Sequence, residues 1–397
     1  MKAPRVLFVH NRYRLPGGED AVVDAEIELL KNRGHEVEIY IRDNHELEGM
    51  RPFDALAQTV WSRRSWRDVQ WLIGAFRPDV IHVHNTFARV SSSIYWAAAR
   101  AGVPVVQTLH NFRLMCVQAM FLQNDNVCED CLGRVPWRGV VRKCYRGSHL
   151  ESAALAATLG VHRALGTFRD KVTRYIALTE FCRRKFIEGG LPASRVTVKP
   201  NFADIAHPGD GPRSGGLYVG RLSSEKGMAT LMAALELLPG IVLDVIGDGP
   251  EAARVRDHPG LKLQGWLSHE EIYARMRGAS YLVMPSIWYE NFPRTLIEAF
   301  GNGLPIIASH RGSLLELVDH GCTGLLFRPG SAEDLAQHIG WAETHSGAMR
   351  LMGTNARRKY EDEFTPDRNY ERMMAIYRDA IAAAKPATKP PAKMRAA

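Results

Sequence analysis

The sequence lacks any run of 18 or more apolar residues, so it predicts no membrane-spanning helix. The N-terminal stretch MKAPRVLFVHNRYR has neither the apolar core nor the small-residue cleavage site of a signal peptide. We therefore expect a cytoplasmic protein. Cysteine is scarce, with six residues in 397, and four of these fall between Cys116 and Cys144. That distribution argues against a disulfide scaffold.

The composition is that of a globular protein, with 46% hydrophobic and 24% charged residues, and the length suffices for two domains. The net charge of +8 is unevenly placed. Residues 134–174 hold nine Lys and Arg against Glu151 and Asp170, a local net charge of +7. This excess of positive charge predicts an anionic partner: a membrane surface, a phosphorylated lipid or nucleic acid. The alternative is that the segment forms a basic face exposed only to solvent.

Two series of alternating strands and helices run along the chain, separated by the Pro- and Gly-rich stretch ADIAHPGDGPRSGG. Strands that alternate with helices predict parallel sheets, hence an α/β protein with two Rossmann-like doubly wound domains that face a central cleft. The first domain covers 1–205, with a cysteine-bearing insert at about 111–148, and the second covers 206–365. A helix at 366–384 crosses back to the first domain, and 385–397 is a disordered tail.

The stretch Tyr281–Gly303, YLVMPSIWYENFPRTLIEAFGNG, predicts a buried strand, an aromatic loop and a helix. Glu290 lies in the loop, Glu298 lies inside the helix, and Pro293 occupies the expected first helical position. The free amides of the helix start therefore lie between two carboxylates. This arrangement suits a phosphate that carries a sugar on each side.

A second loop, GRLSSEKG at Gly220–Gly227, follows a predicted strand and precedes a helix. Gly220 permits a tight turn, while Arg221 and Lys226 place two cations near the helix start, as a diphosphate clamp would. Basic loop residues are more often simply solvated. Because both strands belong to one sheet, this loop and the Glu290 loop should open on the same cleft.

The ordered set VGRLSSEKG, IGDGP, QGWLS and ENFPRTLIEA resembles the retaining glycosyltransferases of family 4, which have the GT-B fold. The signature of that family is a pair of Glu residues separated by seven positions, here Glu290 and Glu298. The resemblance extends to PDVIHVHN and TLHNFRLMC in the first half, so it covers nearly the whole chain.

The resemblance implies that the second half binds a nucleoside-diphosphate sugar. Glu298 would bind the ribose hydroxyls and Glu290 the hydroxyls of the transferred sugar. Arg221 and Lys226 would neutralise the departing nucleoside diphosphate. The backbone facing the diphosphate or the sugar comes from consecutive residues, Asn291, Phe292, Pro293, Arg294 and Thr295.

Three further positions follow from the same resemblance. His110 matches an active-site histidine near the reacting sugar. Gly17 and Gly18 match a glycine loop that approaches the donor phosphate. The backbone near Trp266 and Leu267 would meet the base. His82 and His84, which alternate on a predicted strand, are interpreted as structural.

The implied reaction is transfer of a hexose, with retention, to a glycan or a lipid-linked glycan acceptor in cell-envelope polysaccharide biosynthesis. The protein would stabilise the departing anion and position the acceptor. No Asp-x-Asp occurs in the chain, which agrees with catalysis without a metal ion. Attack by Glu290 as a nucleophile is the rival route. The resemblance favours same-face attack assisted by the leaving phosphate.

The alternatives are a nucleotide-sugar epimerase or phosphorylase on the same fold, and a zinc-knuckle protein that binds nucleic acid. The Glu290–Phe292 loop argues mildly against both enzyme alternatives, since nothing here resembles a pyridoxal-phosphate lysine site. The nucleic-acid alternative leaves the Arg221, Lys226, Glu290 and Glu298 set unexplained, and we expect no nucleic-acid partner. The basic segment instead suggests peripheral binding at the anionic inner face of the cell membrane.

The four clustered cysteines follow the spacing C-x11-C-x2-C-x12-C, at Cys116, Cys128, Cys131 and Cys144. Four thiolates with one CxxC pair suit a structural zinc ion, and free or buried thiols are the alternative. The surrounding segment is predicted to be irregular, and it is polar, basic and poor in core residues, so a metal would explain how it stays ordered. Cys182 and Cys322 are isolated, and we expect both in the core.

Overall fold

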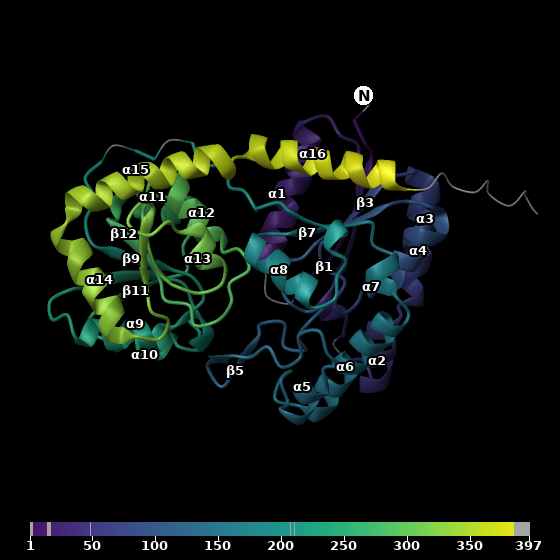
Figure 1. The fold of residues 1–397 in the computed structure, drawn as a ribbon, viewed down its shortest axis with the longest axis horizontal. Helices are drawn as coiled ribbons and strands as arrows, with labels where there is room; N and C mark the ends of the chain where they lie inside the picture. The colour runs from purple at the N-terminus through teal and green to yellow at the C-terminus, as the bar shows by residue number, and fades with distance from the viewer. Residues whose placement is uncertain (1–2, 14–16, 48, 207, 210, 385–397) are drawn as a thin grey trace, which may run out of the picture.

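The computed structural model describes residues 3–13, 17–47, 49–206, 208–209 and 211–384. The predicted disordered tail at 385–397 lies outside the described residues. The chain forms two six-stranded sheets, with helices on the faces of each, as side-by-side lobes (Figure 1). Within the described part, no helix combines the length and apolarity needed to cross a bilayer.

Every ladder of the first sheet is parallel, and the strand order is β2-β1-β3-β4-β7-β8. The strands are short and largely buried, as expected for a sheet covered on both faces. Their bounds are β1 Val6–Arg12, β2 Val37–Asp43, β3 Val80–Val83, β4 Val105–Thr108, β7 Arg174–Ala177 and β8 Val196–Val198. The helices of this lobe are α1 Gly18–Asn32, α2 Pro52–Val60, α3 Arg63–Phe76, α4 Ser93–Ala101, α5 Trp137–Val141, α6 His149–Ala164, α7 Thr167–Asp170 and α8 Glu180–Glu188.

The second sheet is also parallel throughout, in the order β11-β10-β9-β12-β13-β14. Its strands are β9 Gly216–Val219, β10 Leu243–Ile246, β11 Leu261–Gly265, β12 Tyr281–Met284, β13 Ile306–Ser309 and β14 Gly324–Phe327. Its helices are α9 Met228–Glu236, α10 Ala252–Arg256, α11 His269–Gly278, α12 Arg294–Gly301, α13 Ser313–Leu317, α14 Ala332–Thr344 and α15 Ser346–Glu363. The predicted α/β class with two Rossmann-like sheets is confirmed.

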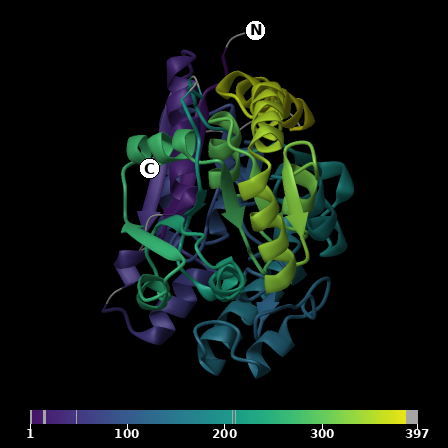
Figure 2. The same cartoon turned by 90° about the vertical axis from the view of Figure 1, so that its left-hand side faces the viewer.

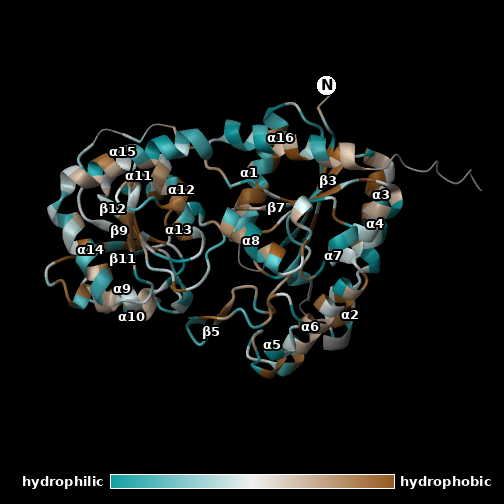
Figure 3. Cartoon of the chain, in the orientation of Figure 1, coloured by the Kyte–Doolittle hydropathy of each residue, from teal (hydrophilic) through white to brown (hydrophobic). Residues whose placement is uncertain are grey.

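The last helix, α16 Pro366–Ala383, runs from the second lobe across the first (Figure 1). The Thr365 side chain caps its first turn, and Pro366 opens it. One face of the helix packs against the first sheet, where Met373 and Tyr377 are fully buried beside Phe8. Hydrophilic residues occupy its outer face (Figure 3). The apolar face of α16 therefore completes the core of the first lobe.

The segment 111–148 is less irregular than the sequence suggested. It contains a two-stranded hairpin, β5 Leu122–Gln123 and β6 Asn126–Val127, and the short helix α5. Its first part also contributes core side chains, among them Phe112 and Phe121 at 0% exposure. The expectation of a segment poor in core residues was wrong for this first part, because apolar residues interrupt its polar pattern. The segment lies at the end of the molecule opposite α16 (Figures 1 and 2).

Candidate active site

The two loops singled out in the second half follow the two strands at which the sheet topology reverses. β9 and β12 pair in the centre of the second sheet although two strands separate them in sequence. In a doubly wound sheet the crossovers from these two strands go to opposite faces, which leaves a crevice at their carboxyl ends. Gly220–Gly227 follows β9, and the loop to α12 follows β12. The topology thus puts both loops at the expected ligand-binding edge.

Lys226 and Glu290 form an ion pair across these two loops. Lys226 Nζ lies 2.7 Å from Glu290 Oε1, and Ser286 donates to the same oxygen at 2.7 Å. Burial alone would raise the pKa of Glu290, but the Lys226 charge and these hydrogen bonds outweigh it and hold the pKa below its ordinary value. Glu290 is therefore an ionised acceptor for hydroxyl groups at neutral pH.

The backbone also fixes the two loops to each other. The amide of Ile287 donates to the carbonyl of Glu225 at 3.0 Å. Gly227 has φ +77°, and a Cβ at this position would lie 1.9 Å from the carbonyl oxygen of Pro285. Only glycine permits so close an approach of the Lys226 loop to the end of β12.

Glu298 lies one helical turn into α12 and is paired within that helix. Arg294 Nη2 is 3.1 Å from Glu298 Oε1, and Glu298 is only 6% exposed. Pro293 is the N-cap of α12, with φ −72° and ψ 119°, and not its first residue as predicted. Its extended ψ keeps it outside the helix. The amides of the first turn still lie between Glu290 and Glu298, because Arg294 opens the helix.

The residues between the two carboxylates are largely buried. Asn291 and Phe292 are each 7% exposed. The side-chain nitrogen Nδ2 of Asn291 is buried and has no hydrogen-bond partner among the described residues. A buried donor without a partner is costly, so this atom is a candidate contact for a ligand. Thr295 lies in the first turn of α12 beside this group.

Arg221 and Trp266 are far more exposed than the ion-paired residues. Within the described part of the chain, the Arg221 guanidinium has no ion-pair partner, so its charge is available to an anion. Trp266, directly after β11, is 82% exposed, whereas Leu267 packs against the core beneath it. These positions lie at the same sheet edge as Lys226 and Glu290.

The first-half residues gather at the corresponding edge of the first sheet. Gly17 and Gly18 start α1 just after β1, and space is open around both positions. His110 follows β4, and its Nε2 lies 2.8 Å from Nδ1 of His84, which follows β3. β1 and β3 are neighbours at the reversal point of this sheet. Among the described residues, no hydrogen bond or ion pair joins His110 to the Lys226–Glu290 pair.

Sequence reasoning missed an acidic group beside His110. Glu19 Oε2 accepts a hydrogen bond from Tyr13 at 3.1 Å, and Asn111 Nδ2 donates to the Tyr13 hydroxyl at 3.1 Å. Burial, together with the charge of Asp20, raises the pKa of Glu19 to about 8. A carboxyl that titrates near neutral pH in this place is a candidate functional group. Its signal in the sequence was its position directly after Gly17-Gly18.

The two lobes touch beside the Glu290 loop. Tyr289 packs its ring 4.8 Å from that of Phe181, at the start of α8. The carboxylate of Glu316, on α13, accepts from the amides of Glu180 and Phe181 at 2.7 Å each. A hollow of about 560 Å³ lies here, lined by residues of both lobes, including Tyr289 and Arg311. The second lobe thus caps helix α8 of the first through Glu316 and contacts it through Tyr289, the residue before Glu290.

The four clustered cysteines line one small cavity, whereas the other two lie apart. Cys116, Cys128, Cys131 and Cys144 surround the same space. Cys182 is buried, but Cys322 is exposed, so the core prediction for Cys322 was wrong. Cys322 lies in the turn before β14, which the sequence pattern did not resolve.

Two families match the two halves of the chain in succession. Residues 17–201 match the glycosyl transferase 4-like domain, and residues 211–359 match glycosyl transferases group 1. Among solved structures, sucrose-phosphate synthase from Thermosynechococcus elongatus superposes with a TM-score of 0.72 at 19% identity, covering 96% of this chain and 100% of that one. HepE of Anabaena in complex with UDP gives a TM-score of 0.65 at 19% identity, covering 94% and 98%.

The curated relatives that match this chain support the same family assignment. Glycogen synthase of Mycobacterium tuberculosis (strain H37Rv) is 31% identical over 308 residues, covering 73% of this chain and 66% of the relative. Phosphatidyl-myo-inositol mannosyltransferase of Mycolicibacterium smegmatis is 24% identical over 354 residues, covering 82% and 80%. 2-Deoxystreptamine N-acetyl-D-glucosaminyltransferase of Niallia circulans is 27% identical over 180 residues, and the match spans 42% of this chain and 46% of that relative.

The two Rossmann-like parallel sheets have the GT-B fold, and the family matches over both halves of the chain make the protein a glycosyltransferase. The chain belongs to the family-4 type of these enzymes, the glycosyl transferases group 1.

Proposed function

We propose that the chain transfers a hexose from a nucleoside-diphosphate sugar, with retention and without a catalytic metal ion, to a glycan or polyprenyl-linked acceptor. The observation that carries this proposal is the Lys226–Glu290 pair at 2.7 Å, next to the Arg294–Glu298 pair at the start of α12. Two carboxylates flank a helix N-terminus that can hold the diphosphate, with cations beside it. UDP, which HepE binds in its solved structure, is the first nucleoside diphosphate to test.

In this mechanism Glu298 binds the ribose and Glu290 the transferred sugar. As the sugar–phosphate bond breaks, negative charge grows on the diphosphate. Arg221, Lys226 and the amides of the first turn of α12 stabilise it. His110, Gly17 and Gly18 approach the sugar and the phosphate from the first lobe. The acceptor hydroxyl then attacks from the face that the diphosphate leaves and passes its proton to an oxygen of the leaving phosphate, so that the anomeric configuration is retained.

The site assignment is tested with Lys226→Ala and Glu298→Ala in a transfer assay over UDP-, GDP- and dTDP-sugars. We expect kcat/KM to fall about 10²- to 10³-fold in each, since each variant removes a contact to the donor. Lys359→Ala and Glu361→Ala, which remove the α15 partners of the ion pairs with Asp319 and Arg357, are matched controls and should keep full activity. Full transfer by folded Lys226→Ala or Glu298→Ala would overturn the assignment. The anomeric configuration of the product, read by NMR, tests retention.

We further propose that the end of the first lobe around α5 contacts an anionic membrane surface in the cytoplasm, where such acceptors are anchored. Trp137 and Val141 are 57% and 61% exposed on one side of α5, and Leu150 is 71% exposed at the start of α6. Exposed apolar side chains among cations are typical of interfacial helices. Arg138 and Arg142 share Asp130 as a partner, which reduces their free charge.

Flotation with anionic vesicles tests this surface. Trp137→Ser combined with Val141→Ser should weaken binding severalfold. Trp71→Ser, which removes a 71% exposed tryptophan from α3, is the matched control and should bind as before. Equal loss in the control, or no loss in the α5 variant, would contradict a specific membrane surface there.

A further inference from the structure

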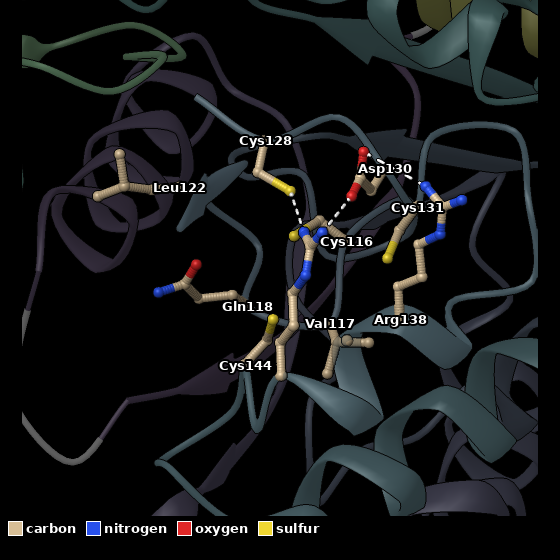
Figure 4. Close-up of a pocket in the computed structure, with 11 residues that line it drawn as sticks. Cys116, Val117, Gln118, Leu122, Cys128, Asp130, Cys131, Arg138 and Cys144 are labelled. Carbon is tan, nitrogen blue, oxygen red and sulfur yellow. Dashed lines mark hydrogen bonds and ion pairs between the residues drawn. The ribbon is translucent and has the colours of Figure 1, made fainter. Parts of the chain in front are cut away.

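The four cysteines of the insert reach one cavity from separate points of the chain. Cys128 follows β6, Cys131 lies in the next turn, and Cys144 follows α5, while Cys116 comes from the buried start of the insert. The cavity measures about 10 Å³, room for one water-sized sphere. Figure 4 shows the labelled cysteines around this space, together with Asp130 and Gln118.

The charges around the cavity complement a tetrathiolate site. Arg142 Nη1 lies 3.3 Å from Cys128 Sγ, and its Nη2 lies 2.7 Å from Asp130. Arg138 also lines the cavity. Four thiolates around one divalent cation carry a net charge of −2, which the two guanidinium groups offset in part, since Asp130 balances one of their two charges.

In the described part of the chain, no three of the four cysteine sulfur atoms lie within 4.8 Å of one another. Among the described residues, the group with three ligand atoms within 4.8 Å of one another is Glu26, His82 and His84, not the cysteines. Cys144 Sγ instead faces Gln123 at 3.3 Å, and Cys128 Sγ faces Arg142. The buried histidine group is a poor metal site, because the Lys199 ammonium lies 2.7 Å from its carboxylate.

We propose that Cys116, Cys128, Cys131 and Cys144 bind one structural Zn²⁺. Binding replaces the thiol protons, which pass to solvent, and forms four zinc–sulfur bonds with no change in oxidation state. Rotation of the Cys128 and Cys144 side chains away from Arg142 and Gln123 brings their sulfurs to the metal. The closed four-sulfur site leaves no open position for substrate, so the role of the metal is to order the insert.

The part of the insert that needs such a crosslink is its second half. Phe112 and Phe121 anchor the first half in the core, whereas Val135, Trp137 and Val141 are all more than half exposed. A metal that joins Cys116 in the core to Cys144 ties this exposed half to the anchored half.

The crosslinked insert also contacts the loop that carries Glu290. The Phe121 ring lies 6.5 Å from that of Tyr289 at 78°, and Glu129 accepts from Lys185, on α8, at 3.0 Å. Tyr289 directly precedes Glu290 in the sequence. Loss of the metal should therefore weaken transfer through the position of this loop, a consequence that rests on the proposed function, whereas metal binding itself does not.

The test is elemental analysis of the full-length chain, purified without chelator, together with a thiol count under denaturing, chelating conditions. We expect about one zinc per chain and six free thiols. Cys128→Ser and Cys131→Ser should each lose most of the zinc, and Cys322→Ser, which changes an exposed cysteine outside the cluster, should keep it. If the cluster variants fail to fold, stepwise zinc release from the unaltered chain by a thiol-modifying reagent serves in their place.

A folded chain without zinc that takes up none when Zn²⁺ is added would overturn the proposal. So would a count of two free thiols, since four of the six would then form disulfides. Replacement by Co²⁺ should give the absorption bands of a tetrahedral thiolate site. A zinc-loaded chain that transfers no sugar would contradict the proposed function and leave the metal site standing.

Discussion

Nδ1 of His84 lies 2.8 Å from Nε2 of His110, and this contact connects His110 to a buried ion pair. Glu26 Oε1 binds Lys199 at 2.7 Å, and its Oε2 faces His84 Nε2 at 3.5 Å. Burial lowers the pKa values of His84 and His110 well below the ordinary value for histidine, so both side chains are neutral. His84 Nε2 and Glu26 Oε2 are buried and have no hydrogen-bond partner among the described residues, so the carboxylate lies near His84 without a hydrogen bond between them.

Glu26→Gln should therefore destabilise the first lobe strongly. The variant leaves the Lys199 ammonium without a counter-charge in a fully buried place. We expect the free energy of unfolding, measured with urea, to fall by about 3–5 kcal/mol. Adding Lys199→Met should recover much of the loss. Glu361→Gln, which removes one partner of an exposed pair with Arg357, should change it by less than about 0.5 kcal/mol. A loss below about 1 kcal/mol for Glu26→Gln would contradict a charged buried pair.

Much of this fold followed from local pattern, because buried parallel strands are apolar runs between loops with Gly and Pro. The placement of Lys226 and Glu290 at one sheet edge also followed, since both loops follow strands of one sheet. Their direct pairing did not, because it depends on how closely two loops approach at Gly227 and Pro285. The Glu26–Lys199 pair could not be predicted from the sequence either, since it joins residues 173 positions apart.

The pH dependence of stability should reveal Glu19. Its pKa is about 8 in the folded protein, above the ordinary value of 4.5. The folded state therefore holds this proton more tightly than the unfolded state does. It follows that stability is highest below the unfolded value and falls as the pH rises through about 8, by at most about 1.4 kcal/mol per pH unit. Glu19→Gln should abolish this component and melt at a higher temperature than the unaltered protein at pH 9.

The control for this prediction lies on the same helix. Asp24→Asn removes a carboxylate that pairs with Arg12 at 3.0 Å near the surface, and its melting curve should follow that of the unaltered protein from pH 5.5 to 9. If the melting temperature of Glu19→Gln also equals that of the unaltered protein from pH 5.5 to 9, Glu19 is ionised throughout this range and the assigned pKa is wrong.

The approach of the two donor loops can be tested at a single glycine. Gly227→Ala would place a methyl group 1.9 Å from the Pro285 carbonyl oxygen, in addition to the strain of φ +77°. Relief of this clash requires the backbone at Gly227 to move away from Pro285, and that movement separates Lys226 from Glu290. We expect lower thermal stability and a loss of donor affinity of at least about tenfold, measured by calorimetry. Gly240→Ala is the matched control, because Gly240 has φ +90° with nothing within 4 Å of the added carbon. It should cost only the backbone strain, about 1–2 kcal/mol, and leave donor affinity unchanged. Equal donor affinity in both variants would show that contact between the two loops does not position Lys226.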